Sequence, residues 1–359
     1  KKNPKQLNFL APIVTYVMTL MAGTGHTAYS TMPVIVEVAK EADIPPRRPL
    51  SLGVVASQMA ITASPISAAV VVFSAMLVEY ETGYEYVDLL LVAIPATLLS
   101  VLITPAVMGL IDKARHAPKL SQIPIYQERL KEGLVAPPEP IVAREIPRKA
   151  KLSVLIFLIG LVFVTTYATL ISDKLQIIKD PIMGRDGAII STMLAVAMII
   201  VMMSKLKVPD VLDASTFKSG MSAAICVLGV AWMGMTFVEA NMDTISRFSS
   251  GILDAMPWLL AVVLMLGAAL MYSQAATTRA LMPLALGVGV SGGAAIAAFP
   301  AVSALFILPT YPTLLAAVEM DDTGSTQIGK YIFNHPFMVP GLLMIGIAVA
   351  LGFGFVLFI

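Results

Sequence analysis

A polar six-residue pattern, S-Q-x-A-x-T, occurs twice in this chain, at residues 57–62 and 273–278. Both copies lie in long apolar stretches that lack charge, and a proline follows each copy within a few residues. Hydroxyl and amide groups can bind carboxylates, and a broken helix presents free N–H groups and a partial positive charge at its N-terminal end. The pattern therefore predicts an anion site built from neutral dipoles.

Paired, interrupted apolar segments in two parts of a chain indicate a transporter binding site between repeats. The competing interpretation is that these small polar residues only pack membrane helices together. We favour binding because both copies lie in apolar stretches that are too long for one crossing. The substrate-binding residues predicted from the two copies are Ser57, Gln58, Thr62, Ser64, Ser273, Gln274, Thr277 and Thr278.

Four further residues complete the predicted substrate-binding set: Thr24, His26, Thr310 and Arg279. An ionisable residue inside a membrane is a functional candidate, but His26 could equally be neutral and bonded to backbone. Arg279 directly follows the second pattern, where it could pair with a carboxylate or extend to the membrane interface. We expect no catalytic residue and no metal site.

The composition excludes an ordinary soluble enzyme. Of 359 residues, 57% are hydrophobic and 13% are charged, whereas soluble domains carry about 25% charged residues. A net charge of +1 gives no argument for nucleic-acid binding. Nucleotide, protease and metal motifs are absent, and the G-x-G-x-x-G match at 287–292 lies in an apolar stretch without strand context. We therefore expect a membrane protein that is not an enzyme.

Charge-free windows long enough to cross a bilayer, about 20 residues each, recur along the chain. Three are overlong and contain Gly, Pro and polar residues, which is tolerated at membrane depth only in broken helices or re-entrant hairpins. The predicted fold is an all-α, polytopic helical transporter with two repeat halves. The windows are 6–36, 49–78, 89–111, 152–172, 187–204, 219–238, 255–278, 280–318 and 331–359.

The loop charges predict an orientation. Segment 112–151 carries nine Lys and Arg residues, whereas segment 79–88 carries none. The positive-inside rule places 112–151 in the cytoplasm. This proline-rich linker would join a first membrane half, 1–111, to a second, 152–359. Contact with lipid headgroups is the preferred explanation of its basic charge.

Several charged or polar residues at or near the ends of the windows are given structural roles. Glu37 and Arg48 flank a short polar loop, 37–49, and we expect them to serve topology and loop structure. His335 precedes a proline near the last window, where a turn or helix-capping role is favoured. The acidic group Glu319, Asp321 and Asp322 indicates a solvated turn.

Short motifs occur along the chain: G-T-G-H at 23–26, M-P-V-I at 32–35, R-P at 48–49, S-Q-M at 57–59, A-S-P at 63–65, S-Q-A-A at 273–276, L-P-T-Y-P at 308–312, G-S-T-x-I-G at 324–329 and N-H at 334–335. Together they resemble the anaerobic C4-dicarboxylate transporter family of the DcuA/DcuB type, within the wider ion-transporter superfamily. The similarity covers nearly the whole chain in order. Two departures stand out: relatives have further hydrophobic segments before the point where this chain begins, and Arg279 stands where they have a small or aliphatic residue.

The resemblance implies a carrier in the bacterial inner membrane that exchanges fumarate, malate, aspartate and succinate by an elevator-type motion. It implies a homo-oligomer, with a dimer favoured, and a sensor kinase as a further partner besides lipid. No cofactor is expected, and coupling to Na⁺ or H⁺ stays open. The alternatives are a carrier for another organic anion, a sodium-coupled symporter, and a membrane co-sensor that binds ligand without transporting it.

Overall fold

The computed structural model describes residues 6–135, 147–171, 177–178, 180–213, 236, 240–241, 256 and 258–359. These residues form helices, turns and loops and contain no β-strand, as the all-α prediction requires. Window 219–238 lies outside the described residues, apart from residue 236. The helices are α1 (Leu7–Ala22), α2 (Ala28–Glu41), α3 (Arg47–Ile61), α4 (Ala68–Glu79), α5 (Tyr86–Ala114), α6 (Pro124–Lys131), α7 (Arg148–Leu170), α8 (Arg185–Ser204), α9 (Val208–Asp213), α13 (Leu259–Met271), α14 (Gln274–Gly287), α15 (Gly292–Ala298), α16 (Pro312–Met320) and α17 (Met338–Phe355).

The overlong apolar windows are divided into separate helices at their polar, Gly and Pro residues. Gly23 ends α1 in the left-handed conformation, with φ of 69°, which glycine adopts without steric cost. Helices α3 and α4 separate at residues 62–67, where the Ser67 hydroxyl caps α4. Helices α13 and α14 separate at Tyr272 and Ser273, and the Ser273 hydroxyl caps α14. Each break exposes helix ends inside an apolar segment.

Two helices among the described residues are long and apolar enough to cross a membrane, Tyr86–Ala114 and Met338–Phe358. The first has 29 residues and is therefore about 44 Å long, whereas the hydrocarbon core of a bilayer is about 30 Å thick. It begins with a reciprocal capping box between Glu85 and Asp88. Helix α5 is therefore long enough to carry its last turn beyond the hydrocarbon.

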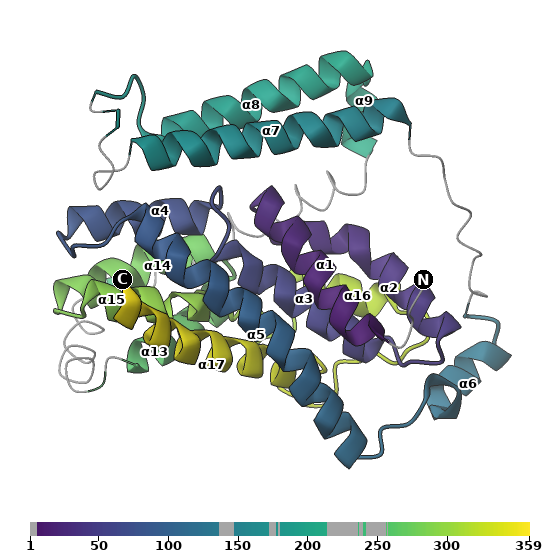
Figure 1. Ribbon diagram of the computed structural model, residues 1–359. Coiled ribbons are helices and arrows are strands. Elements are labelled where there is room, and N and C mark those ends of the chain that lie inside the picture. Colours follow the sequence, from purple (N-terminus) through teal and green to yellow (C-terminus); the bar gives the residue numbers. More distant parts are fainter. Residues whose placement is uncertain are drawn as a thin grey trace.

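One hydrophobic core joins early and late parts of the chain. Helix α1 packs along α3, the C-terminal α17 packs along α5, and α14 packs against α4 (Figure 1). A buried hydrogen bond of 2.8 Å between Tyr16 Oη and Thr97 Oγ1 ties α1 to α5. The two proposed halves, 1–111 and 152–359, therefore share one interior among the described residues.

Helices α7 and α8 form a pair at the top of Figure 1. Gly160 allows their close approach, because a Cβ at this position would lie 2.5 Å from Cγ2 of Val196. Val164 packs on Val71 of α4 and joins the pair to the main body. Several large apolar side chains of α7 and α8 remain exposed, as expected where lipid is the solvent: Leu155, Val162, Phe163, Leu194, Met198 and Met202.

Candidate functional site

Gln58 is the least satisfied polar side chain of the predicted set. It lies near the end of α3 and is 1% exposed. Neither its amide nitrogen nor its amide oxygen has a hydrogen-bond partner. Leaving a buried polar group unsatisfied costs about 1–3 kcal/mol, and such groups in native proteins call for an explanation. An amide held in this state is prepared to bind a polar ligand.

The second pattern lies beside it. The side-chain amide of Gln274 donates to the backbone carbonyl oxygen of Gln58 at 3.5 Å, so segments far apart in sequence meet here. Gln274 is the first residue of α14, and the Ser273 hydroxyl accepts the N–H of Ala276 at 3.1 Å. The N–H groups of Gln274 and Ala275 are unpaired within the described part of the chain. The N-terminal end of α14 thus offers donors and a positive dipole next to Gln58.

The Gly-Thr-Gly-His turn packs against the same part of α3. A Cβ on Gly25 would lie 3.8 Å from both the carbonyl oxygen and Oγ of Ser57. Thr24 is exposed and accepts the N–H of His26 at 3.4 Å. The His26 ring stacks on Tyr29 with centroids 5.8 Å apart, and its Nδ1 atom has no partner. The turn therefore presents one unused ring nitrogen near the S-Q segment.

Tyr272, which the sequence did not single out, connects the break before α14 to the segment before α16. Its hydroxyl bonds to the hydroxyl of Thr310, and its ring stacks on Tyr311 with centroids 6.1 Å apart. Tyr272 adopts a positive φ of 51°, which is uncommon for an aromatic residue. Its position directly before an S-Q motif was the available signal. Thr310 thus joins the second pattern through a tyrosine.

The remaining predicted hydroxyl groups are used within the protein. Each donates to a backbone carbonyl oxygen, so these groups can accept but not donate a further hydrogen bond, whereas an anion needs donors. They shape the helices around the amides. The bonds are Ser57 to Val54 at 2.7 Å, Thr62 to Met59 at 2.8 Å, Ser64 to Leu20 at 2.6 Å, Thr277 to Ser273 at 2.8 Å and Thr278 to Gln274 at 2.7 Å.

Arg279 lies apart from the predicted set. Its side chain is exposed, whereas Thr277 and Thr278 are buried. It forms no ion pair or hydrogen bond with the described residues. Of its two possible roles, the exposed position fits extension toward an interface better than pairing with a carboxylate in the site.

The acidic turn after α16 differs from the sequence prediction of a solvated turn. Asp321 is 2% exposed. Its carboxylate accepts the N–H of Thr323 at 3.1 Å, the hydroxyl of Thr323, the hydroxyl of Ser325 at 2.8 Å and the N–H of Thr326 at 2.7 Å. Charge-assisted bonds of this kind explain why the carboxylate is stable when buried. Asp321 organises the loop from within.

The neighbouring charges join the end of α2, the loop after α16 and helix α6. Lys40 pairs with Glu37 at 2.8 Å and with Asp322 at 3.0 Å. Burial alone lowers the pKa of Lys40, which lies in the polar segment predicted outside the membrane, but these two carboxylates outweigh burial and the pKa is raised. Arg129 of α6 donates to the Asp322 carbonyl at 2.8 Å. The start of the 112–151 linker is therefore docked on the loop after α16.

Arg48 and His335 both contact distant parts of the chain, and His335 does not cap α17 as the sequence suggested, since the N-cap of that helix is Phe337 without a side-chain bond. Arg48 donates to Asp112 at the end of α5, with 2.7 Å from Nε to Oδ2. Nε2 of His335 lies 3.3 Å from the Ile307 carbonyl oxygen. No group of three or more His, Cys, Asp or Glu residues that could hold a metal ion occurs among the residues described.

The sequence matches one transporter family over residues 1–359, the family described as "anaerobic c4-dicarboxylate membrane transporter", DcuA_DcuB. The chain is 54% identical over 355 residues to the C4-dicarboxylate transporter DcuA of Wolinella succinogenes, covering 98% of this chain and 80% of that protein. It is 51% identical to DcuA of Escherichia coli K12, covering 99% and 80%. Identity to the anaerobic C4-dicarboxylate transporter DcuB of Escherichia coli O6:H1 is 33%, with the same coverage. No solved structure matches the chain.

Proposed function

Because this chain belongs to the DcuA/DcuB family of anaerobic C4-dicarboxylate membrane transporters, we propose that it exchanges C4-dicarboxylates at the meeting point of α3 and α14. The family consists of transporters and not enzymes, in agreement with the sequence prediction. One carboxylate binds the N-terminal end of α14, through the N–H groups of Gln274 and Ala275. The Gln58 amide binds the ligand beside it.

The observation that carries this proposal is the unpartnered amide of Gln58, buried next to a helix N-terminus. Both features are neutral, so the empty carrier holds no uncompensated charge at membrane depth. A dianion brings charge with it, and the amide and N–H dipoles replace part of its hydration. Ser57 acts mainly by shaping its segment, since its hydroxyl proton is already donated to the Val54 carbonyl oxygen. The Ser273 hydroxyl caps α14 by accepting the N–H of Ala276, which leaves its own proton available to the ligand.

The test is counter-exchange of labelled fumarate by the purified chain in proteoliposomes. Gln58→Leu removes the amide at similar volume, and Gln274→Ala removes the contact between α3 and α14. Each substitution is expected to reduce exchange by roughly tenfold or more, as for one or two lost hydrogen bonds to a charged ligand. Gln6→Leu, at an exposed position before α1, is the matched control. Unchanged exchange in both site variants would contradict the site.

The finer properties extend the proposal. Fumarate, malate, aspartate and succinate are the proposed substrates, the bacterial inner membrane the location, and an elevator-type motion the mechanism. A homodimer and a sensor kinase are the proposed partners. Exchange with and without sodium distinguishes an antiporter from a sodium-coupled symporter. Ligand binding without flux would instead favour a co-sensor.

A further inference from the structure

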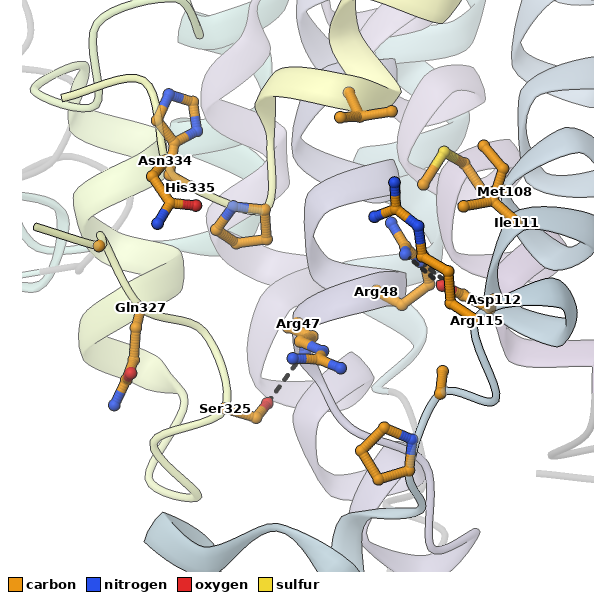
Figure 2. Close-up of a pocket in the computed structure, with 15 residues that line it drawn as sticks. Arg47, Arg48, Met108, Ile111, Asp112, Arg115, Ser325, Gln327, Asn334 and His335 are labelled. Atoms are coloured by element: carbon orange, nitrogen blue, oxygen red, sulfur yellow. Dashed lines mark hydrogen bonds and ion pairs between the residues drawn. The ribbon is translucent and has the colours of Figure 1, made fainter. Parts of the chain in front are cut away.

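A cavity of about 520 Å³ opens where the start of α3, the end of α5 and the segment before α17 meet. It is separate from the predicted S-Q site, and none of the predicted substrate-binding residues lines it. Figure 2 shows arginine side chains from two of these segments around it. Asn334 and His335 come from the third segment, together with Gln327. The chain thus builds a second polar site from parts distant in sequence.

The charge balance of this cavity is positive. Arg47, Arg48 and Arg115 line it, and Asp112 is the one carboxylate among the lining residues. Three positive charges and one negative charge leave a formal charge of +2. Arg48 is held by Asp112, whereas the guanidinium groups of Arg47 and Arg115 form no ion pair with any described residue. Two arginines are therefore available for a ligand.

Contacts around the cavity hold the backbone at Arg47 and the side chain of Arg48. The backbone N–H of Arg47 donates to the Ser325 hydroxyl at 3.1 Å, and Ser325 in turn donates to buried Asp321. Arg115 caps the C-terminal end of α5, one turn after Asp112. In Figure 2 the Arg48 guanidinium is joined to Asp112, and Arg115 extends into the same part of the cavity. The start of α3 and the end of α5 thus bring the three arginines to one cavity.

The cavity lies at a helix end where full charges are tolerated. Asp112 and Arg115 follow the apolar window 89–111 of α5, which alone is long enough to cross the hydrocarbon. The basic segment that begins here is the one that the charge rule assigns to the cytoplasm. Guanidinium groups bind carboxylates bidentately, and cavities of about 300–1,000 Å³ suit small molecules.

We propose that this cavity is an anion-capture site that binds C4-dicarboxylate dianions at the cytoplasmic mouth before they reach Gln58. Arg47 and Arg115 bind the two carboxylates, and Asp112 keeps Arg48 oriented. The dianion matches the +2 charge of the lining. A positive cleft also raises the local concentration of an anionic substrate and its rate of association. The identity of the ligand rests on the proposed function.

Two measurements on the full chain test this site. The first is calorimetric titration of succinate into Gln58→Leu protein, in which the central site is disabled. Adding Arg47→Gln and Arg115→Gln is expected to weaken the remaining binding by roughly tenfold or more, because two charge-assisted contacts are lost. Lys113→Gln removes a charge from the same turn of α5 but does not line the cavity, and it should change binding less than twofold.

The second measurement is succinate exchange by otherwise unaltered protein in vesicles of known orientation. The double variant Arg47→Gln and Arg115→Gln is expected to raise KM roughly threefold to tenfold on the face that carries the cavity. Its kcat, and its KM on the opposite face, should stay unchanged. The conservative pair Arg47→Lys and Arg115→Lys keeps the charge and should recover part of this affinity. A purely structural role would not produce a change in KM on one face.

Three results would overturn the capture site. The first is an equal effect of Lys113→Gln and the arginine variants. The second is a KM change that occurs only in vesicles with phosphatidylglycerol and not in pure phosphatidylcholine, because the arginines would then bind lipid phosphate. The third is unchanged succinate titration. If the wild-type chain exchanges no dicarboxylate, the proposed function fails, but the titration still decides whether the cavity binds the dianion.

Discussion

The proposed binding region around Gln58 and the proposed capture cavity around Arg115 offer opposite chemistry to the same class of ligand. The first is buried and neutral, and offers an amide with the first N–H groups of α14. The second lies beyond the apolar part of α5 and carries three arginines. A full charge at membrane depth is expensive, whereas at the water boundary it is cheap. Depth in the membrane therefore decides which chemistry is used.

The difference also matters when the sites are empty. A guanidinium in the cavity stays hydrated without a ligand, so its charge persists and attracts anions over the Debye length. An unoccupied neutral amide leaves no net charge to carry through the membrane. Affinity in the centre depends on dipoles that are already oriented, and attraction at the mouth depends on charge. Each substitution or condition below changes either the oriented dipoles of the centre or the charge at the mouth.

The largest effect is expected from placing a charge in the neutral region. Gln58→Glu keeps the shape of the side chain but adds a carboxylate that repels the dianion and is costly to bury. Fumarate exchange should fall by roughly 100-fold or more, as expected for about 3 kcal/mol of lost affinity. The measurement is initial counter-exchange rate in proteoliposomes, normalised to protein amount.

The matched control is Gln6→Glu, which makes the same chemical change at an exposed position before α1. It should exchange fumarate at the wild-type rate. Substantial exchange by Gln58→Glu would mean that the neutral region does not hold the dianion, and the contrast between the two regions would be lost.

Asp321 tests whether the charged cavity depends on its buried loop. Asp321→Ala removes the acceptor of bonds from Thr323, Ser325 and Thr326. The free energy of unfolding should drop by about 2 kcal/mol, seen as a lower Tm for the purified protein. Ser325 also accepts the backbone N–H of Arg47, which lines the cavity. The affinity for succinate should therefore fall by a larger factor than the kcat of fumarate exchange. The control Glu128→Ala, at an exposed position of α6, should change neither the Tm nor the affinity for succinate. If it lowers them as much as Asp321→Ala does, the buried loop does not support the cavity.

The ion pair at the end of α5 separates net charge from orientation. Arg48→Gln alone lowers the lining charge from +2 to +1 and leaves Asp112 without its arginine, so KM for succinate should rise about fivefold. Adding Asp112→Asn restores +2 and should recover about half of that loss in free energy. Exchange kinetics on the face that carries the cavity give both values. Full recovery of the KM would show that only the net charge of the lining matters. No recovery would show that only the orientation of Arg48 by Asp112 matters.

The smallest effect is that of salt. Raising KCl from about 0.05 M to about 0.5 M shortens the Debye length, so KM on the cavity face should rise about twofold to threefold. The kcat at saturating substrate, set in the neutral region, should stay constant. The double variant Arg47→Gln and Arg115→Gln should lose this salt response. If the KM of that double variant responds to salt as strongly as the wild-type KM, the two arginines do not attract the substrate.

Local features of the fold followed well from the sequence. The polar residues and Gly23 mark helix ends inside the apolar windows: α1 ends at Gly23, and α13 and α14 separate at Tyr272 and Ser273. Proline was a poorer guide, since Pro283 lies inside α14 and Pro340 inside α17. The repeated S-Q pattern also drew attention to Gln58 and Gln274, which lie in contact. These inferences succeed because breaks and caps depend on residues near one another in sequence.

Features that depend on packing did not follow. The two S-Q copies look alike, yet one ends α3 and the other begins α14, because helix ends depend on what each segment packs against. Asp321 was expected in solvent, and only its bonds within the folded loop explain its burial. The arginine cavity joins residues 47, 115 and 335, and no spacing in the chain shows that they meet.

Helix α5 has a mechanical consequence. It begins at its Glu85 capping box and ends beside the arginine cavity, and its 29 residues form one continuous helix. Pro95 and Pro105 lie inside it, and each removes a backbone hydrogen bond, so the helix can bend there while it still joins the cavity to its other end. Spectroscopic labels at the two ends of α5 would therefore show whether the helix moves as one body or bends at its prolines during the transport cycle.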